Sequence, residues 1–213
     1  YKCVYNTAVD LSGEGRDEEG IALIREASAR FGTSPLYGEY AYAAAASQAG
    51  MLMKQKRYAD AAAAVENCRD LIDESSYREM TEGILFNSLN NDISTLPAET
   101  ALAHLHDSRM RLSEERYARL VSYAYASEAQ RTADSEGWLA GAAAAEKGLE
   151  ELPADETLRK LRSLYRRNYA AEVHNNAARM FNSGDKDGAK YAVREGLEKI
   201  PESTILADDM KRF

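Results

Sequence analysis

The sequence predicts an all-α fold built from repeated pairs of helices, on three observations. Residues that favour helices, such as Ala, Glu, Arg and Leu, are abundant, whereas proline occurs only 4 times in 213 residues. Alternating stretches of Val, Ile and Thr, which strands need, are almost absent. The stretch Asn175–Pro201 also has a copy upstream, because GLEELP at Gly148–Pro153 matches GLEKIP at Gly196–Pro201. Repetition on this scale indicates an array of similar helical units.

Composition and charge exclude several classes of protein. Hydrophobic residues make up 45% of the chain, enough to bury a core, so we do not expect wholesale disorder. The net charge of −8 argues against nucleic-acid binding, which normally shows a basic footprint. The most apolar stretch, Tyr40–Leu52, is too short and too polar for a membrane span. The chain begins with Tyr1 rather than methionine, so we expect a processed form or a fragment of a soluble protein, either cytoplasmic or exported.

The repeated units are defined by small, apolar and small residues at positions i, i+4 and i+7, the spacing of one helical face. Small residues let two helices approach closely, and the larger residue between them fills the layer. We therefore expect all of these positions to be buried. They are Gly20, Ile24 and Ala27; Ala61, Val65 and Cys68; Ala101, Leu105 and Ser108; Gly141, Ala145 and Gly148; Ala189, Val193 and Gly196; and, on the preceding helices, Ala8, Ala49, Leu89, Ala129 and Ala177.

Periodicity and helix-end signals place the expected helices. Ser135 is the expected N-cap of the helix that contains Trp138. In the tail, Leu206, Met210 and Phe213 share one helical face and suit a short cap on the end of a stack. The expected helices are 1–11, 17–31, 36–55, 58–74, 77–91, 97–113, 115–133, 137–151, 155–182 and 186–199, followed by the tail at 203–213.

The small residues at the helix crossings, with prolines closing the last two units at Pro153 and Pro201, resemble the tetratricopeptide repeat (TPR) family in a degenerate form. The resemblance implies a right-handed α–α superhelix, a TPR-like solenoid, of about five helix–turn–helix repeats plus a C-terminal capping helix. The repeats expected within this single domain (1–213) are 1–34, 42–75, 82–115, 122–153 and 155–201, with the cap at 203–213.

The last interval between units is unusually long. From Gly141 to Ala189 it spans 48 residues, against about 34 for the standard repeat of the family. The excess is close to four helical turns, and whole turns lengthen a helix without rotating its buried face. We therefore predict one long helix from about Asp155 to Asn182.

Proteins of this family commonly act as binding scaffolds, so the resemblance implies a non-enzymatic protein that binds a peptide or partner protein in a concave groove lined by the first helices. It implies no cofactor. The clamp of Lys, Asn and Arg with which some members hold a terminal carboxylate is missing here, since Tyr5 and Val9 occupy its first two positions. The alternative is a structural, self-associating spacer of a larger, membrane-anchored or exported protein, which would form a homo-oligomer. The groove positions carried over from the family are Lys2, Tyr5, Phe86, Asn87, Asn90, Tyr123, Gln130, His174 and Asn175.

Motifs for metal binding or catalysis are weak or missing. The turn around Gly188 lacks the Glu that a calcium loop needs at its twelfth position, where Arg194 stands, so we interpret it as a helix–helix turn. His104 and His106 point to opposite sides of a helix and cannot share a metal ion. Neither GxSxG nor GxxxxGK occurs. Cys3 and Cys68 have no metal-ligand spacing, and we expect both to be free thiols.

Two features of the sequence are stronger candidates for a binding surface. Arg159, Arg162 and Arg166 form a basic stripe on the predicted long helix. The stripe is either a solvated face that pairs with nearby carboxylates or a docking surface for an acidic peptide or partner. The chain also has 13 tyrosines, which suit both helix seams and binding grooves.

Overall fold

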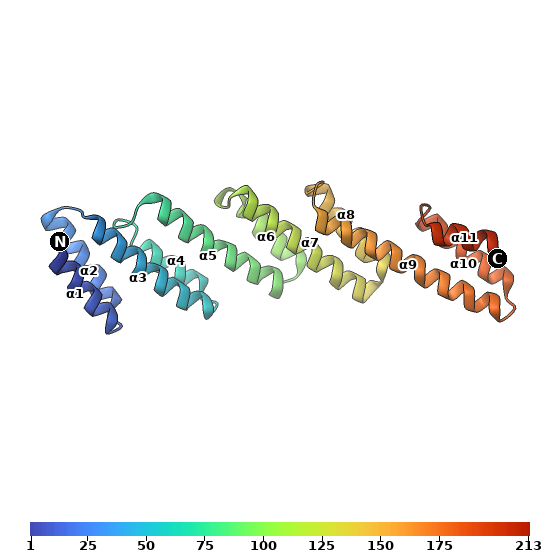
Figure 1. Ribbon diagram of the computed structural model, residues 1–213, viewed down its shortest axis with the longest axis horizontal. Helices are drawn as coiled ribbons and strands as arrows, with labels where there is room; N and C mark the ends of the chain where they lie inside the picture. The colour runs from blue at the N-terminus through green and yellow to red at the C-terminus, as the bar shows by residue number, and fades with distance from the viewer. The chain divides into compact units, whose positions relative to one another are not determined.

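A computed structural model describes all residues from 1 to 213 and confirms the all-α prediction. The chain forms eleven α-helices and one 3-10 helix, with no strand (Figure 1). In order, they are α1 (Lys2–Gly13), α2 (Asp17–Phe31), α3 (Pro35–Lys54), α4 (Tyr58–Glu66), α5 (Glu74–Thr95), α6 (Ala98–Asp107), η1 (Arg109–Arg111), α7 (Glu114–Glu136), α8 (Trp138–Glu151), α9 (Glu156–Asn182), α10 (Lys186–Lys199) and α11 (Thr204–Arg212).

The chain divides into two compact units. Unit 1 comprises Tyr1–Thr95 with Ala103–Tyr117, and unit 2 comprises Leu96–Leu102 with Ala118–Phe213. In unit 1, α3 packs on both α1 and α2, and α5 packs on both α3 and α4. In unit 2, α9 packs on α8 and α10, and α11 packs on α9 and α10. Within each unit the helices therefore pack in sequence order, each new pair on the pair before it.

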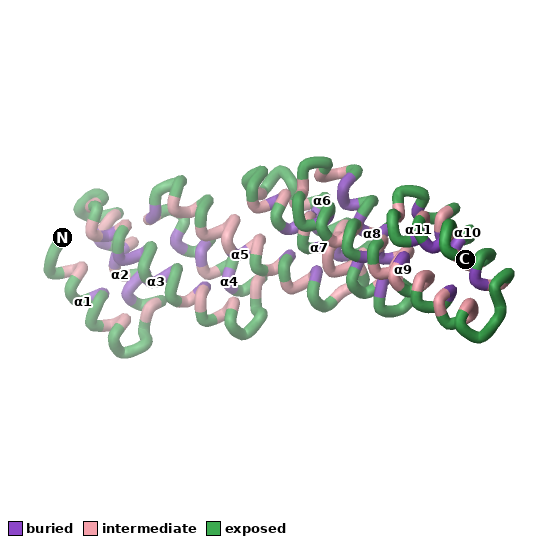
Figure 2. The backbone as a smooth tube through the Cα atoms, turned by 45° about the vertical axis from the view of Figure 1, so that its right-hand side comes forward, coloured by how far each residue is buried: buried purple, intermediate pink, exposed green.

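The repeated small and apolar positions are buried, as predicted. Every one is buried except Ser108, which is half-buried. Figure 2 shows the buried residues as short segments that recur along the helices. In unit 1, one core that includes Tyr37 and Tyr40 (1% and 5% exposed) contains Ala8, Ile24, Ala27, Ala49, Ala61, Val65 and Cys68. In unit 2 the repeated positions contribute to two clusters, one around Tyr165 and one around Val193 and Leu206.

Two glycines show why small residues are needed at the crossings. A β-carbon at Gly141 on α8 would lie 2.5 Å from Cβ of Ala133 and 2.8 Å from the carbonyl oxygen of Ala129, both on α7. A β-carbon at Gly148 would lie 2.7 Å from Cδ1 of Leu158 on α9 and 2.7 Å from Cβ of Tyr125 on α7. These helices therefore meet at distances that exclude even a methyl group.

Acidic or hydroxyl side chains cap the N-termini of the three C-terminal helices. Asp155 accepts a hydrogen bond from the N–H of Leu158 (2.8 Å), and α9 then runs unbroken to Asn182, which confirms the predicted long helix. Asp185 accepts from the N–H of Gly188 (2.9 Å), so the turn before α10 is a capped helix start, as interpreted from the sequence. Ser203 caps α11, the predicted C-terminal cap.

Helix boundaries differ from the prediction at several ends. The expected helix 97–113 ends at Asp107 and is followed by η1, and the expected helix 77–91 extends from Glu74 to Thr95. The expected helix 58–74 ends at Glu66. Asp73 accepts hydrogen bonds from the N–H (2.9 Å) and hydroxyl (2.7 Å) of Ser76, and so caps a start of α5 at Glu74, earlier than expected. Ser135 was wrong as the N-cap of α8. Its hydroxyl donates instead to the carbonyl of Arg131 within α7, and Gly137, at φ 96°, is the N-cap.

We expect Gly141→Ala to destabilise the protein by about 1–3 kcal/mol, because the added methyl group overpacks the α7–α8 crossing and outweighs the gain in helix propensity. Urea unfolding followed by circular dichroism measures the change.

The matched control is Gly83→Ala on α5, where a β-carbon would meet nothing within 4 Å. It is expected to stabilise the protein by about 0.5–1 kcal/mol through helix propensity alone. Equal stabilisation by both substitutions would contradict the close crossing.

Candidate partner-binding surfaces

The groove positions expected on the first helix of each repeat are called first-helix positions here. In unit 1 they lie on α1 and α5. Lys2 is exposed, whereas Tyr5 is half-buried against the core of the unit. On α5, Phe86 is half-buried, and Asn87 and Asn90 are exposed. The side-chain amide of Asn87 donates to the carbonyl of Gly83 (2.8 Å). Of this set, Lys2 and Asn90 are the residues most open to a partner.

In unit 2, two expected positions lie on α7. The side chain of Tyr123 is exposed (44%). Gln130 is exposed, but its Oε1 accepts a hydrogen bond from the hydroxyl of Tyr165 (3.0 Å) and its Nε2 donates to Asp134 (2.9 Å). Gln130 therefore orients the buried Tyr165, while Tyr123 has an open ring face.

The remaining expected positions, on α9, lie beside the cap. Nδ1 of His174 is 2.6 Å from Oδ2 of Asp209 on α11. The Asp209 side chain is only 6% exposed, so His174 supplies the polar partner that a buried carboxylate needs. Nearby, the rings of Phe181 and Phe213 stack at 4.9 Å. The His174 ring thus helps to dock α11, whereas Asn175 is exposed.

The three arginines of the basic stripe bond to separate partners. Arg159 donates to the carbonyl of Pro153 (2.5 Å). Arg162 pairs with Glu146 on α8 (2.7 Å), and Arg166 pairs with Glu202 in the α10–α11 connection (2.6 Å). Bonds from its own backbone N–H and then from Arg166 lower the pKa of Glu202. Two of the three arginines, Arg162 and Arg166, therefore pair with nearby carboxylates, while about a third of each of these side chains stays exposed (35% and 33%).

Sequence reasoning missed a groove in each unit. In unit 1 a groove of about 1000 Å³ lies between α4, α5 and the η1 segment. Its walls include three alanines on α4 and Met110, which is 94% exposed. Glu82 closes one side, where hydrogen bonds from the side chain and backbone of Ser113 lower the pKa of its carboxyl. The alanines are Ala59, Ala62 and Ala63.

The groove in unit 2 has a volume of about 890 Å³ and lies between α8, the middle of α9 and the α10–α11 connection. It contains two arginines of the basic stripe, Arg162 and Arg166, but none of the expected first-helix positions. The one sequence signal for it was the extra length of α9, because added turns separate the helices that pack along its two ends.

Other chemistry-bearing residues have ordinary roles. Nδ1 of His104 lies 2.9 Å from Asp92, and no group of three or more His, Cys, Asp or Glu residues could hold a metal ion. Both cysteines are free: Cys3 is exposed and Cys68 is buried, and burial raises the pKa of the Cys68 thiol. No helix has both the length and the apolar character that crossing a membrane requires.

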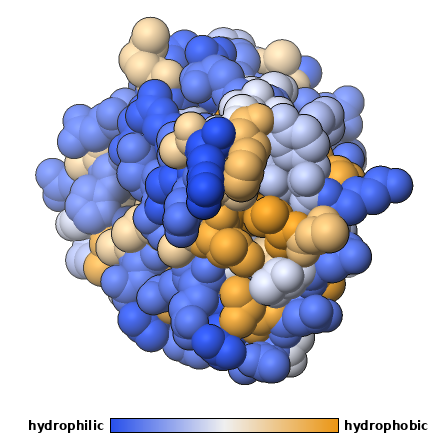
Figure 3. All heavy atoms as spheres, turned by 90° about the vertical axis from the view of Figure 1, so that its left-hand side faces the viewer, coloured by the Kyte–Doolittle hydropathy of each residue, from blue (hydrophilic) through white to orange (hydrophobic).

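The end of unit 1 formed by α1 and α2 has an apolar surface. Figure 3 views this end and shows apolar residues gathered between hydrophilic ones. On these two helices, Val9 and Phe31 are 43% and 58% exposed. This apolar surface is a second type of candidate contact.

Comparison with models of known protein families, with curated proteins and with solved structures finds no match.

We expect His174→Ala to destabilise the protein by about 1–3 kcal/mol, because it leaves the buried Asp209 carboxylate without its partner. Hydrogen exchange of the α11 amides should accelerate, and urea unfolding gives the free-energy change.

Replacing both His174 and Asp209 with leucine leaves no unpaired polar group. The stability of this double variant should therefore be closer to that of the wild-type protein than the stability of His174→Ala is. A matched surface control is Lys211→Ala, whose partner Asp208 is 76% exposed and for which little change is expected. Unaltered α11 exchange in His174→Ala would contradict the role of this pair.

Proposed function

We propose that this chain is a non-enzymatic, TPR-like helical-repeat scaffold that binds a protein or peptide partner. The observation that carries the proposal is an open groove in each unit, floored by one helix and walled by others. Grooves of this kind accept side chains of a helical or extended peptide, with apolar contacts for affinity and charged residues for orientation.

The packing order supports the TPR-like part of the proposal. In a stack of helix pairs, the first helix of each pair contacts both helices of the pair before it. In unit 1, α3 and α5 each contact both helices of the preceding pair, and in unit 2 the cap α11 does the same. Burial of the small residue sets at corresponding positions agrees with a repeated unit that stacks on its neighbours.

Two kinds of surface are available to a partner. The first comprises the exposed first-helix positions, of which Tyr123 has the largest exposed ring. Tyrosine is enriched at binding hot spots because it combines an apolar ring with a polar tip. The second comprises the grooves. Self-association remains the second candidate function, and the exposed Val9 and Phe31 on the α1–α2 end favour it.

We expect Tyr123→Glu combined with Asn90→Lys to abolish capture of the partner, because both residues are exposed on first helices and the changes add charge to one candidate position in each unit. Affinity capture from a cell extract, followed by mass spectrometry, measures the loss. Both changes are on the surface, so the thermal unfolding midpoint should not change.

The matched control is Tyr191→Glu on α10, a second helix, where the tyrosine is 61% exposed. This variant should capture the partner normally. If the first-helix variant captures the same proteins as the wild type, this surface is excluded. Capture of only a second copy of the chain, with concentration-dependent mass in light scattering, would favour self-association.

A further inference from the structure

The unit 2 groove exists because α9 is longer than the helices that cover it. The last helical turns of α8 lie near the start of α9, and α10 packs back along its C-terminal half. Figure 1 shows α8 and the α10–α11 pair over different parts of α9. Between them the middle of α9 forms the floor of the groove, from Arg162 to Ala170.

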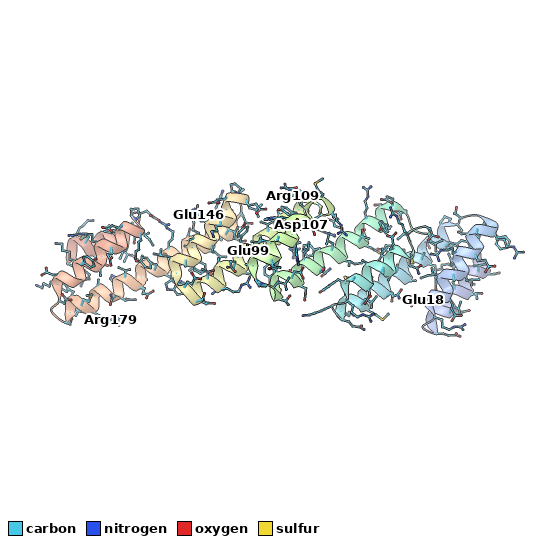
Figure 4. All side chains as sticks on the ribbon, turned by 180° about the vertical axis from the view of Figure 1, so that it is seen from behind. Glu18, Glu99, Asp107, Arg109, Glu146 and Arg179 are labelled. Atoms are coloured by element: carbon cyan, nitrogen blue, oxygen red, sulfur yellow. The ribbon has the colours of Figure 1, made fainter.

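Two arginines fix the walls to this floor. Arg162 reaches Glu146 on α8, labelled in Figure 4, and Arg166 reaches Glu202 on the opposite wall through both Nε (2.7 Å) and Nη2 (2.6 Å). A guanidinium has five N–H donors in a rigid fork, and these contacts use only one or two of them. Both side chains line the groove, so their remaining donors are held in place for an acceptor that enters it.

Two basic side chains in the groove have no carboxylate partner. Arg167 and Lys147 line it, are exposed, and have no ion-pair or hydrogen-bond partner. Of the three carboxylates in the lining, Glu146 and Glu202 are already paired, and only Glu150 is unpaired. The lining is therefore net positive in a chain whose formal charge is −8.

Apolar side chains lie beside these charges. Ala142 and Ile200 are buried in the walls, and Ile205 is 42% exposed at the edge. Ala143 is exposed and lines the α8 wall, where its small size leaves room for a guest side chain. A ligand that matches the groove thus needs both carboxylates and apolar side chains, spaced as on one face of a short helix.

We propose that the unit 2 groove binds an acidic, amphipathic segment of a partner protein, with its carboxylates on Arg167, Arg162 and Arg166 and its apolar side chains against Ala143 and Ile205. This inference rests on the proposed function and assigns it a site and a class of partner. It adds a binding site in this groove to the first-helix positions such as Tyr123.

The test uses a fluorescent helical peptide of about 16 residues, long enough to form a helix, built from Leu, Ala and Glu with Leu on one face. A second peptide has Lys in place of every Glu. Fluorescence anisotropy with the full chain should show binding of the Glu peptide, weakened by added salt, and no binding of the Lys peptide. Equal binding of the two peptides, or no binding of the Glu peptide, would overturn the proposal.

Variants locate the site. Arg167→Glu should weaken binding of the Glu peptide about tenfold or more, because it reverses a charge in the groove without breaking a pair. Ala143→Arg should abolish binding, because the larger side chain would fill the part of the groove beside α8. Arg179→Glu is the matched control: it lies on the same helix outside the groove, near the other end of α9 in Figure 4, and should bind like the wild type.

Unchanged binding by Arg167→Glu would overturn the proposal, as would a concentration-dependent dimer that this substitution abolishes, because a second copy would then occupy the groove. Thermal unfolding midpoints confirm that each variant is folded. Failure of the peptide to bind, with partner capture still lost in the Tyr123→Glu and Asn90→Lys variant, would reject this site while supporting the proposed function.

Discussion

The helices of this chain approach one another at points that have no room for a larger side chain. At Gly141 and Gly148 a single added carbon would overlap atoms of neighbouring helices, including a backbone oxygen. Helix axes can come this close only where the contact residues are Gly, Ala or Ser. Because the same small residues recur along the chain, they set which faces meet in each helix pair, and the larger residues between them, such as Val65 and Val193, are fully buried as a result.

The long helix α9 changes what this packing produces in unit 2. A repeat of ordinary length would bring the next pair of helices against α8. The extra turns instead leave the middle of α9 between two walls, and ion pairs from Arg162 and Arg166 join it to both. The extra length of α9 thereby creates a groove whose lining is net positive, although the chain as a whole is net negative. This is the physical basis for assigning the groove an acidic partner.

Local and periodic features were predictable from the sequence, and contacts between distant residues were not. Spacing alone placed the buried positions and the ends of α9, because helix geometry fixes which residues share a face. It did not predict that α4 ends at Glu66, and it placed the start of α5 three residues late, because the cap at Asp73 leaves no trace in the apolar spacing. Nor could it show that His174 contacts Asp209, a pairing across 35 residues that only the folded cap creates. The grooves were missed for the same reason: their walls come from separate helices.

The continuity of α9 can be measured directly, and both the packing of unit 2 and its groove depend on it. Backbone NMR chemical shifts and amide exchange of the full chain should show one unbroken helix from Glu156 to Asn182, with protected amides through the floor from Arg162 to Ala170. Helical shifts and slow exchange across that floor are the predicted result. Non-helical shifts or rapid exchange there would contradict the account, because the two walls would then have no rigid helix between them.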